Sequence, residues 1–393
     1  MTSWDAIVVG SGPGGAITAH SLARRGASVL LLDRQAFPRW KVCGGCLSAG
    51  ALGALQAAGL GDLVESRGAV QLHHLELIAG AQRARIPLRG SAALSRPKLD
   101  QGLVDAAISE GVCFRAPARA RLGALFRHGR IVRVATDRGE TEYLGKIVID
   151  ATGLGTGLEL PRPAASPHAH PPERESRSPS REVALRSRVG LGATIEDPEY
   201  DLTAGELRMI VGRIGYVGLV RVEDGCLNIA AAVDPAALRG RSPAEAVVEI
   251  FTEAGLLPPR ADVVHGWRGT PALTRRRTDV GAERLFRLGD AAGYVEPFTG
   301  DGMCLALHSG LAVSELAITA VQVWQPDLLN AWSTYHRRSV ALSQRLCRML
   351  AWALRRPRLV RAFVGVLGRE PRLAEPFVRK AADTPRLRVA RAA

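Results

Sequence analysis

Lysine is scarce in this sequence. Among 52 basic residues in 393, only Lys41, Lys98, Lys146 and Lys380 are lysines, so arginine carries almost all of the positive charge behind the formal net charge of +14. Such an arginine excess is what a GC-rich coding sequence produces. A basic stripe interleaved with aromatic residues, typical of nucleic-acid binding, is absent. The charge therefore predicts weak attraction to anionic surfaces and no nucleic-acid partner.

Cysteine and long apolar runs are also scarce. Six cysteines at irregular spacings do not make a disulfide framework in a chain of this length. The opening "MTSWDAIVVG" lacks a basic region and enters a strand pattern, which is unlike a signal peptide. No apolar run reaches the roughly 18 residues that span a bilayer. We expect a cytoplasmic protein whose 47% hydrophobic content supports a large core.

The first clear pattern is a glycine-rich turn between two strands, in "DAIVVGSGPGGAITAHSLARRGASVLLLDR" (5–34). Ala6–Val9 is an apolar run typical of a strand buried on both faces. A helix is expected over Ala16–Arg25, ended by Gly26, followed by a second buried strand over Ser28–Leu32. The segment therefore predicts a βαβ unit.

This unit has the G-x-G-x-x-G spacing of a dinucleotide-binding turn, at Gly10, Gly12 and Gly15. The first glycine closes the turn, the second lets backbone approach a pyrophosphate at the helix N-terminus, and the third allows close packing. Asp33 ends the second strand, where a carboxylate accepts from ribose hydroxyls. A purely structural turn is the alternative. We expect the ADP half of a dinucleotide to contact Gly10, Gly12, Pro13, Gly14, Gly15, Asp33 and Arg34.

A later segment distinguishes FAD from NAD. "LFRLGDAAG" resembles the segment of FAD proteins of the p-hydroxybenzoate hydroxylase fold whose aspartate, here Asp290 after Gly289, contacts the ribityl chain. The next stretch, "EPFTGDGMCLALHSG", leads into a helix whose N-terminus would stabilise negative charge on a reduced flavin. "LSRPKLDQGLVDAA" resembles the helix whose leading arginine, here Arg96, lies against FAD. The expected cofactor is FAD, with further contacts from Arg96, Gly289, Asp290, Gly300, Gly302 and Met303.

Three segments together resemble the geranylgeranyl reductase family of FAD enzymes: "KVCGG", "GDAAGYVEPFTGDG" and "GYVGLVRVEDGCLNIA". The resemblance leaves residues 161–182 and the C-terminal helices uncovered. This chain has Thr-Gly-Asp-Gly at 299–302, where the family usually has Glu before the last Gly. The resemblance implies an FAD-dependent oxidoreductase that reduces C=C bonds of a prenyl or other long apolar substrate by hydride transfer from reduced flavin.

The loop "FPRWKVCGGCLS" (37–48) would then run along FAD, with Lys41, Gly44 and Gly45 as contacts. Cys43 or Cys46 could donate a proton to the carbon that does not receive the hydride. Simple packing of both cysteines is the equal alternative. Zinc needs four ligands and the sequence offers no second Cys/His pair, so we expect no metal.

The expected fold class is α/β: a discontinuous Rossmann-like FAD-binding domain with an inserted β-rich substrate domain and C-terminal helices. Hairpin patterns at 70–88 and 206–233, the latter turning at Asp224-Gly225, predict one sheet built from two separated segments. A Pro- and Ser-rich stretch lies between the two. The predicted divisions are 1–69, 94–160 and 265–325 for the FAD domain, 70–93 and 183–264 for the β-rich domain, 161–182 for a flexible insert, and 326–393 for the helical region.

Other functions are compatible with this fold. A flavin-dependent monooxygenase or dehydrogenase acting on an aromatic or polyketide substrate in secondary metabolism is the main alternative, because fold does not settle chemistry. Against hydroxylases, the segment at 150–155 reads "DATGLG" where many have Asp-Gly; against halogenases, no Trp-x-Trp-x-Ile-Pro stretch occurs. A flavin- or lipid-binding module without turnover is the non-enzymatic alternative.

The substrate and the electron donor are less well defined. Tyr216, Trp267 and Tyr294 are candidates for lining a cavity that takes an apolar or aromatic substrate. No second glycine fingerprint is present, which leaves NAD(P)H or a separate carrier as electron donor.

At the C-terminus, Leu342, Leu346, Leu350 and Leu354 form one stripe of a helix, with Arg345, Arg348, Arg355 and Arg356 elsewhere on it. Packing on the core is the first interpretation. Peripheral contact with a membrane through these basic helices is the second.

Overall fold

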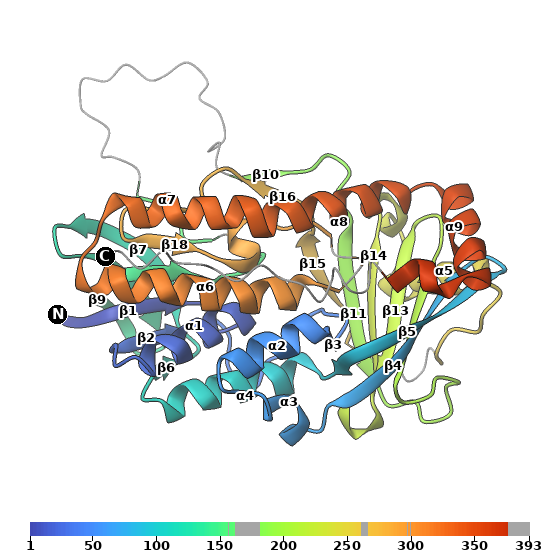
Figure 1. Ribbon diagram of the computed structural model, residues 1–393, viewed down its shortest axis with the longest axis horizontal. Coiled ribbons are helices and arrows are strands. Elements are labelled where there is room, and N and C mark those ends of the chain that lie inside the picture. The colour runs from blue at the N-terminus through green and yellow to red at the C-terminus, as the bar shows by residue number, and fades with distance from the viewer. Residues whose placement is uncertain (156, 162–180, 261–265, 297, 299, 376–393) are drawn as a thin grey trace, which may run out of the picture.

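Two large β-sheets lie side by side along the long axis of the molecule, each flanked by helices (Figure 1). The computed structural model describes residues 1–155, 157–161, 181–260, 266–296, 298 and 300–375. The predicted insert at 161–182 falls almost wholly outside these residues, as does the end of the predicted helical region.

The first sheet has a parallel centre in the order β18-β9-β1-β2-β6. Its strands are β1 (Thr2–Val9), β2 (Val29–Leu32), β6 (Cys113–Arg115), β7 (Arg119–Phe126), β8 (Gly129–Thr136), β9 (Gly139–Asp150), β17 (Gly281–Ala282) and β18 (Leu285–Arg287). Ala6 to Val8 and Leu30 to Leu32 are fully buried, as expected for strands covered on both faces. The predicted βαβ unit is confirmed, and β9 and β18 bring distant segments next to it.

Helices α1 (Pro13–Ala23), α2 (Ala49–Ala57), α3 (Leu63–Ser66) and α4 (Arg96–Ser109) lie together beside this sheet (Figure 1). α1 begins three residues before the predicted Ala16, because Pro13 is favourable in the first turn of a helix. Gly26 has a φ of +82° and follows its end, as predicted.

Helix α6 (Gly302–Gln322) packs on α1. By its length and its apolar composition it is the one helix of the described residues that could cross a membrane. The expectation that no such stretch exists is therefore corrected. More than half of the stretch is buried inside the protein, as in the core helix of a soluble protein, so length and composition are weak evidence for a membrane span.

The second sheet has the order β15-β11-β14-β13-β12-β4-β5-β3. Its strands are β3 (Cys46–Leu47), β4 (Val70–Ala79), β5 (Gln82–Ala93), β11 (Val189–Ile195), β12 (Glu206–Val211), β13 (Gly215–Arg221), β14 (Leu227–Val233) and β15 (Arg268–Ala272). Both predicted hairpins are present, and the parallel pair β12–β4 joins them into one sheet, as expected. The division of the chain into separate domains stays a prediction.

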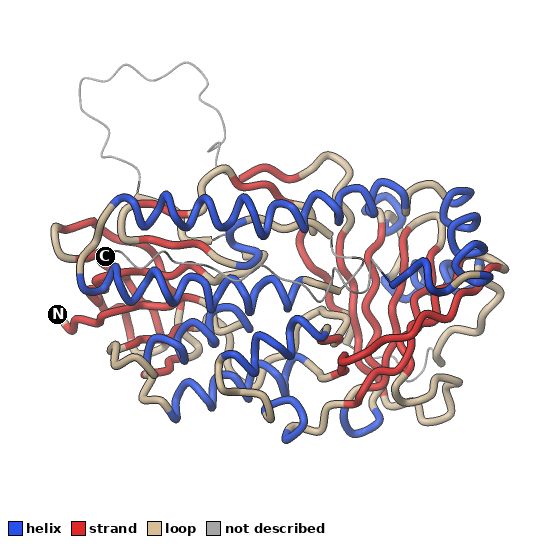
Figure 2. Tube along the Cα trace, viewed as in Figure 1, coloured by secondary structure: helices blue, strands red, loops and turns tan. Residues whose placement is uncertain are grey.

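Helices cover both faces of this second sheet (Figure 2). α5 (Pro243–Glu253), which the sequence analysis did not predict, packs Val247, Ile250 and Phe251 on one face. α9 (Pro357–Arg369) packs Val360, Val364 and Leu367 on the other.

The C-terminal region is helical, as predicted: α7 (Pro326–Tyr335), a π-helical turn over His336–Val340, α8 (Ala341–Ala353) and then α9. In the predicted leucine stripe of α8, Leu354 is buried and Leu350 is half-buried, while the side chains of Leu342 and Leu346 lie outside the described part. The described part of the stripe, Leu350 and Leu354, therefore packs against the rest of the protein.

Candidate functional site

The glycine turn after β1 closes so tightly that only glycine fits. Gly10 has a φ of +101°, and a Cβ on Gly15 would lie 1.8 Å from the carbonyl oxygen of Gly10. A Cβ on Gly10 would lie 2.2 Å from the carbonyl oxygen of Ala151, just after β9. The turn is thus held against the carboxyl end of β9, which is where ligands bind in open α/β sheets.

Two arginines face the start of α1. The Nη2 atoms of Arg96 and Arg39 lie 3.7 and 3.8 Å from where a Cβ on Gly12 would be. Gly12 is the N-cap residue of α1, so these guanidinium groups add to the positive end of the helix dipole. Arg96 was predicted here. Arg39 was missed, although it lies in the quoted loop, because nothing in its local sequence separates it from the many other arginines.

Arg39 is almost completely buried and bridges two carboxylates. Its Nη2 lies 3.3 Å from Asp33 and 3.2 Å from Asp100, while Arg96 donates to both oxygens of Asp100 at 3.0 and 2.9 Å. The Nε and Nη1 atoms of Arg39 have no hydrogen-bond partner in the described residues. A buried cation with spare donors beside a helix N-terminus suits a pyrophosphate.

Asp33 lies at the end of β2, as predicted, and is already engaged. Its Oδ2 accepts from the Ser11 N–H at 3.0 Å and from the Ser11 hydroxyl at 2.8 Å, while Oδ1 accepts from Gln35 N–H at 3.0 Å. Burial alone raises the pKa of Asp33, but Arg39 and these hydrogen bonds outweigh it and leave the pKa below its ordinary value. A lone pair of Oδ1 stays open for a ribose hydroxyl. Arg34 reaches the loop after β9, near Gly155.

The second predicted half of the site comes to the same place. A Cβ on Gly14 would lie 2.6 Å from Cδ1 of Leu288, the residue before the short turn Gly289–Ala292. A small cavity of about 20 Å³ is lined by Asp290 together with Gly302, the first residue of α6. The glycine turn, Asp290 and the start of α6 therefore converge, although almost 300 residues separate them in the chain.

The charge of Lys41 is close enough to Asp290 to influence the pKa of that carboxyl group. Burial raises the pKa of Asp290, although Lys41 and Arg96 oppose it. Burial also lowers the pKa of Lys41 to about 8, with the neighbouring charges of Arg39 and Arg96 adding to the effect. Lys41 therefore lies near the predicted site, in a position where an anion would favour its charged form.

The loop 37–48 connects the glycine turn to the second sheet. Trp40 donates to the Thr194 hydroxyl of β11 at 2.9 Å, and Asn228 of β14 donates to the carbonyl of Cys43 at 2.9 Å. Gly45, with a φ of +71°, makes the turn that leads into β3. Gly44 is exposed.

The two cysteines of the loop differ, and both are free thiols. The Cys43 sulfur lies 3.9 Å from the sulfur of Met303, in the first turn of α6, and also interacts with Arg96. The Cys46 thiol donates to the carbonyl of Gly44 at 3.4 Å, and burial raises its pKa to about 12. Cys43 is thus the cysteine that faces the convergence of the motifs.

Two of the three predicted aromatic residues lie near each other. The Tyr216 ring of β13 packs edge-on against Phe298 at 5.0 Å, and Tyr216 is close enough to Tyr294 to help raise the pKa of Tyr294. Burial raises the pKa of both phenols well above the ordinary value, helped by Glu296 for Tyr216 and by Asp290 for Tyr294. Both therefore stay protonated at neutral pH.

Trp267 is the exception. It packs with the cluster that lies under α5, whereas Tyr216 belongs to the cluster on the opposite face of the sheet. Trp267 therefore lies on the other face of the sheet from Tyr216, and a role in lining a substrate cavity stays a prediction for all three residues. The sequence could not show this, because Trp267 lies just before β15 (Arg268–Ala272) and outside any strand whose alternation would assign its face.

Beside Tyr216 lies a buried ion pair that the sequence analysis missed. Nη1 of Arg188 donates to Oε1 of Glu296 at 2.9 Å, and both side chains are almost fully buried. Arg188 also lies over the Tyr216 ring at 5.5 Å. The pair joins the start of β11 to the segment after Asp290. The predicted flavin contact Gly300 is exposed and has a φ of +75°.

The residues present fit FAD. A glycine cradle, a helix N-terminus and buried guanidinium donors suit the pyrophosphate, and a second helix start beside Asp290 suits the flavin end. Comparison with known proteins agrees: residues 5–162 match the family described as FAD dependent oxidoreductase. The chain is an FAD-dependent oxidoreductase.

Two curated relatives of this oxidoreductase are reductases. A menaquinone reductase of Mycolicibacterium smegmatis is 26% identical over 379 residues, covering 91% of this chain and 86% of the relative. A digeranylgeranylglycerophospholipid reductase of Methanopyrus kandleri is 26% identical over 332 residues, covering 81% of each chain.

Solved structures share the fold. The crystal structure of p-nitrophenol 4-monooxygenase from Pseudomonas putida has a TM-score of 0.78 at 14% identity, covering 98% of this chain and all of that one. Flavin-dependent halogenases are among the other structures with this architecture. The predicted α/β FAD-binding fold is therefore confirmed, while likeness at this identity carries no information about the reaction.

Proposed function

We propose that this FAD-dependent oxidoreductase reduces a C=C bond of a prenyl or other long apolar substrate, as in the geranylgeranyl reductase family. The observation that carries the proposal is the alignment with two reductases over most of the chain. The Cys43 loop supports it, because it brings a thiol to the start of α6.

The reaction needs a hydride for one carbon and a proton for the other. FAD, when bound and reduced, supplies the hydride. The proton donor must keep its proton at neutral pH and lie at the site. Two groups are our candidates: the Tyr294 hydroxyl, whose pKa burial raises well above its ordinary value, and the Cys43 thiol, which lies beside Met303. The substrate gains two electrons and two hydrogens, and the donor regains its proton from solvent.

Protein groups around the site would hold the cofactor and tune it. Arg39 and Arg96 would neutralise the pyrophosphate, and the N-terminus of α6 would stabilise negative charge at the flavin end. Loop 37–48, fixed to β11 and β14, would cover the site and limit access of water.

The test is a single turnover with the purified holoenzyme. The FAD-loaded protein is reduced without oxygen and mixed either with geranylgeraniol or with menaquinone. We expect one of these to reoxidise the flavin and to gain two mass units in its prenyl chain, measured by mass spectrometry of chain fragments after any quinol has been reoxidised in air. If neither is changed, and air alone reoxidises the protein while a phenolic substrate gains oxygen, the reductase proposal fails.

The second candidate is oxygen chemistry on an aromatic or polyketide substrate. A monooxygenase shares the fold over the whole chain, so the fold is compatible with this chemistry but does not decide between the two reactions. The two functions predict opposite behaviour of the reduced protein in air: a reductase reacts slowly until its alkene is present, whereas a monooxygenase consumes oxygen rapidly when its substrate is bound.

We also propose peripheral contact with an anionic membrane through α9. Its second face carries Leu359, Phe363 and Val366, which are 46 to 51% exposed, and Arg358, Arg361 and Arg369 are exposed on the same helix. An exposed apolar stripe on a helix that also carries exposed cations is typical of an interfacial helix. The substrate would then enter from a lipid phase.

Flotation with vesicles containing phosphatidylglycerol tests this contact. The protein should float with these vesicles, and the Phe363→Ser variant should float several-fold less. Equal flotation of both proteins, or none with the parent, would refute the contact. Either result leaves the reductase proposal untouched.

A further inference from the structure

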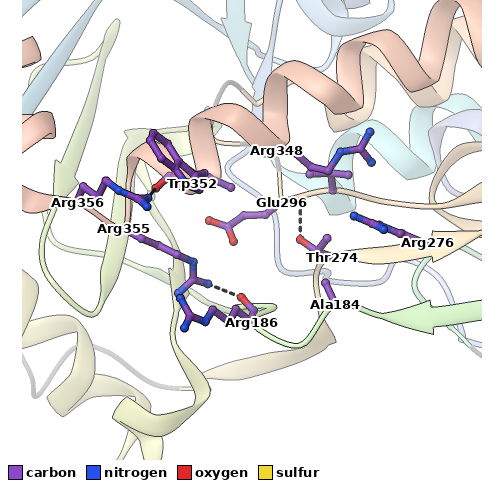
Figure 3. A pocket seen from close by; sticks show the side chains of 11 residues that line it. Ala184, Arg186, Thr274, Arg276, Glu296, Arg348, Trp352, Arg355 and Arg356 are labelled. Carbon is purple, nitrogen blue, oxygen red and sulfur yellow. Dashed lines mark hydrogen bonds between the residues drawn. The ribbon is translucent and has the colours of Figure 1, made fainter.

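A cavity of about 520 Å³ lies between α8, the short strand β16 (Arg275–Arg277) and the loop that follows β10 (Arg181–Val183). It is lined by Arg186, Arg276, Arg348, Arg355 and Arg356, with Glu296 as the one carboxylate of its wall. Figure 3 shows these side chains, which come from the helix, the strand and the loop, on different sides of Glu296. None of these five arginines contributes to the FAD site described above.

The carboxylate in the cavity wall does not balance the positive charge of the arginines that line the cavity. Glu296 is paired with Arg188, which lies outside the lining, at 2.9 Å. Arg355 donates to Asp234 at 2.6 Å and to the carbonyl of Arg186. The guanidinium groups of Arg276 and Arg348 are close enough that, after burial, Arg276 is the largest cause of the lowered pKa of Arg348. Several guanidinium groups that repel one another around an open space are stabilised by an anion.

The mouth of the cavity combines charge with an aromatic ring. Trp352 is 57% exposed, and the guanidinium of Arg356 lies over its ring at 3.5 Å. An exposed ring beside arginines provides apolar contact for the organic part of an anionic molecule.

The cavity lies next to the flavin end of the site. Val295 lines both this cavity and the small cavity shared by Asp290 and Gly302. On α8, Cys347 faces the small cavity and Arg348, the next residue, faces the large one. A molecule anchored among the arginines could therefore reach toward Tyr294 and Asp290.

We propose that this cavity binds the phosphate or diphosphate group of an organic molecule. Arg186, Arg276 and Arg348 provide the planar donors that match phosphate oxygens, and Trp352 contacts the attached organic group. The molecule is either the substrate, with its head group held here, or a phosphate-bearing electron donor such as NADPH. The binding does not depend on which reaction the enzyme performs.

The test uses the FAD-loaded protein, so that the pyrophosphate site beside Gly12 is filled. Inorganic pyrophosphate is titrated by calorimetry into the parent, into the R276Q/R348Q variant and into R89Q/R127Q, which removes two exposed arginines elsewhere. We expect saturable binding to the parent, at least tenfold weaker binding to R276Q/R348Q, and unchanged binding to the control. Should R276Q/R348Q lose its FAD or its thermal transition, R186Q, at an exposed position, replaces it with the same expectation.

Two further titrations identify the source of the phosphate. If R276Q/R348Q binds NADPH more weakly than the parent but binds NADH equally well, the cavity holds the electron donor. If it binds geranylgeranyl diphosphate more weakly but binds geranylgeraniol equally well, the cavity holds the substrate. The proposal is overturned if the parent shows no saturable pyrophosphate binding, or if the cavity variant and the surface control bind it equally.

Discussion

The backbone of Gly310 in α6 lies directly against the carbonyl oxygen of Gly14 in α1. A Cβ on Gly310 would lie 2.5 Å from that oxygen and 2.6 Å from Ile17. Thr18 adds a hydrogen bond to the carbonyl of Gly310 at 3.2 Å. This contact brings the two helix starts of the site together, because each belongs to one of the two packed helices.

We expect Gly310→Ala to push α1 and α6 apart. A methyl group facing a backbone carbonyl cannot be accommodated by a rotamer change, so the cost is that of overpacking, roughly 1–3 kcal/mol. The variant should unfold at lower urea concentration and retain less FAD after gel filtration. Gly53→Ala is the control: Gly53 lies exposed within α2 with open space around it, and alanine there should stabilise the helix by about 0.5–1 kcal/mol. Equal stability of both variants would contradict the close α1–α6 contact.

Arg39→Gln should be among the most damaging single changes at the site. It leaves the buried Asp33 and Asp100 facing each other without their shared cation, which costs roughly 3–5 kcal/mol for a buried pair. Arg67→Gln breaks the half-exposed pair with Asp105 and should cost about 0–1 kcal/mol. Urea unfolding measures both. A cost for Arg39→Gln no larger than for Arg67→Gln would show that Arg39 is not the buried bridge described.

Binding of FAD should take up a proton near pH 8. In the folded protein without FAD, the pKa of Lys41 is about 8, below its ordinary 10.5, so Lys41 loses its proton as the pH rises through 8 while the unfolded chain keeps it. This lowered pKa costs stability below pH 8, and the cost is relieved between pH 8 and 10.5. Phosphate anions raise the pKa again, so binding at about pH 8.5 takes up part of a proton and binding at about pH 6.5 takes up none.

Calorimetry in two buffers of different ionisation enthalpy measures this uptake. Lys41→Met should abolish it, and Lys98→Met, at a half-exposed lysine on α4, should not. The same uptake in the Lys41 variant would assign the proton to another group.

Cys43→Ala should slow the transfer from reduced enzyme to alkene by about 10²–10⁴-fold if its thiol is the proton donor. The rate at which the electron donor reduces the flavin should be unchanged in this variant. A variant that had lost structure would be slow in this step as well. Cys46→Ala, whose thiol points to the Gly44 carbonyl, should slow the same step by less than threefold. Stopped-flow absorbance follows both steps. If Tyr294→Phe is the slow variant and Cys43→Ala is normal, the phenol is the donor.

Local patterns were sufficient for much of this protein. The glycine spacing, the buried strands on either side and Asp33 depend on short-range backbone geometry, so the βαβ unit could be predicted from residues 5–34 alone. The hairpins of the second sheet could likewise be predicted, because strand alternation and the Asp224-Gly225 turn are local signals. The start of helix α6 near Gly302 could also be predicted from the sequence.

Only the tertiary structure decided which of these parts meet. Arg39 is one of many arginines in the sequence, and burial between Asp33 and Asp100 is what distinguishes it. Trp267 and Tyr216 were equivalent aromatic candidates until the sheet placed them on opposite faces. The arginine-lined cavity joins segments around 186, 276 and 348 that no local pattern connects. Burial and charge pairing arise between segments distant in the chain, so the sequence determined the cofactor's cradle, whereas packing determined what surrounds it.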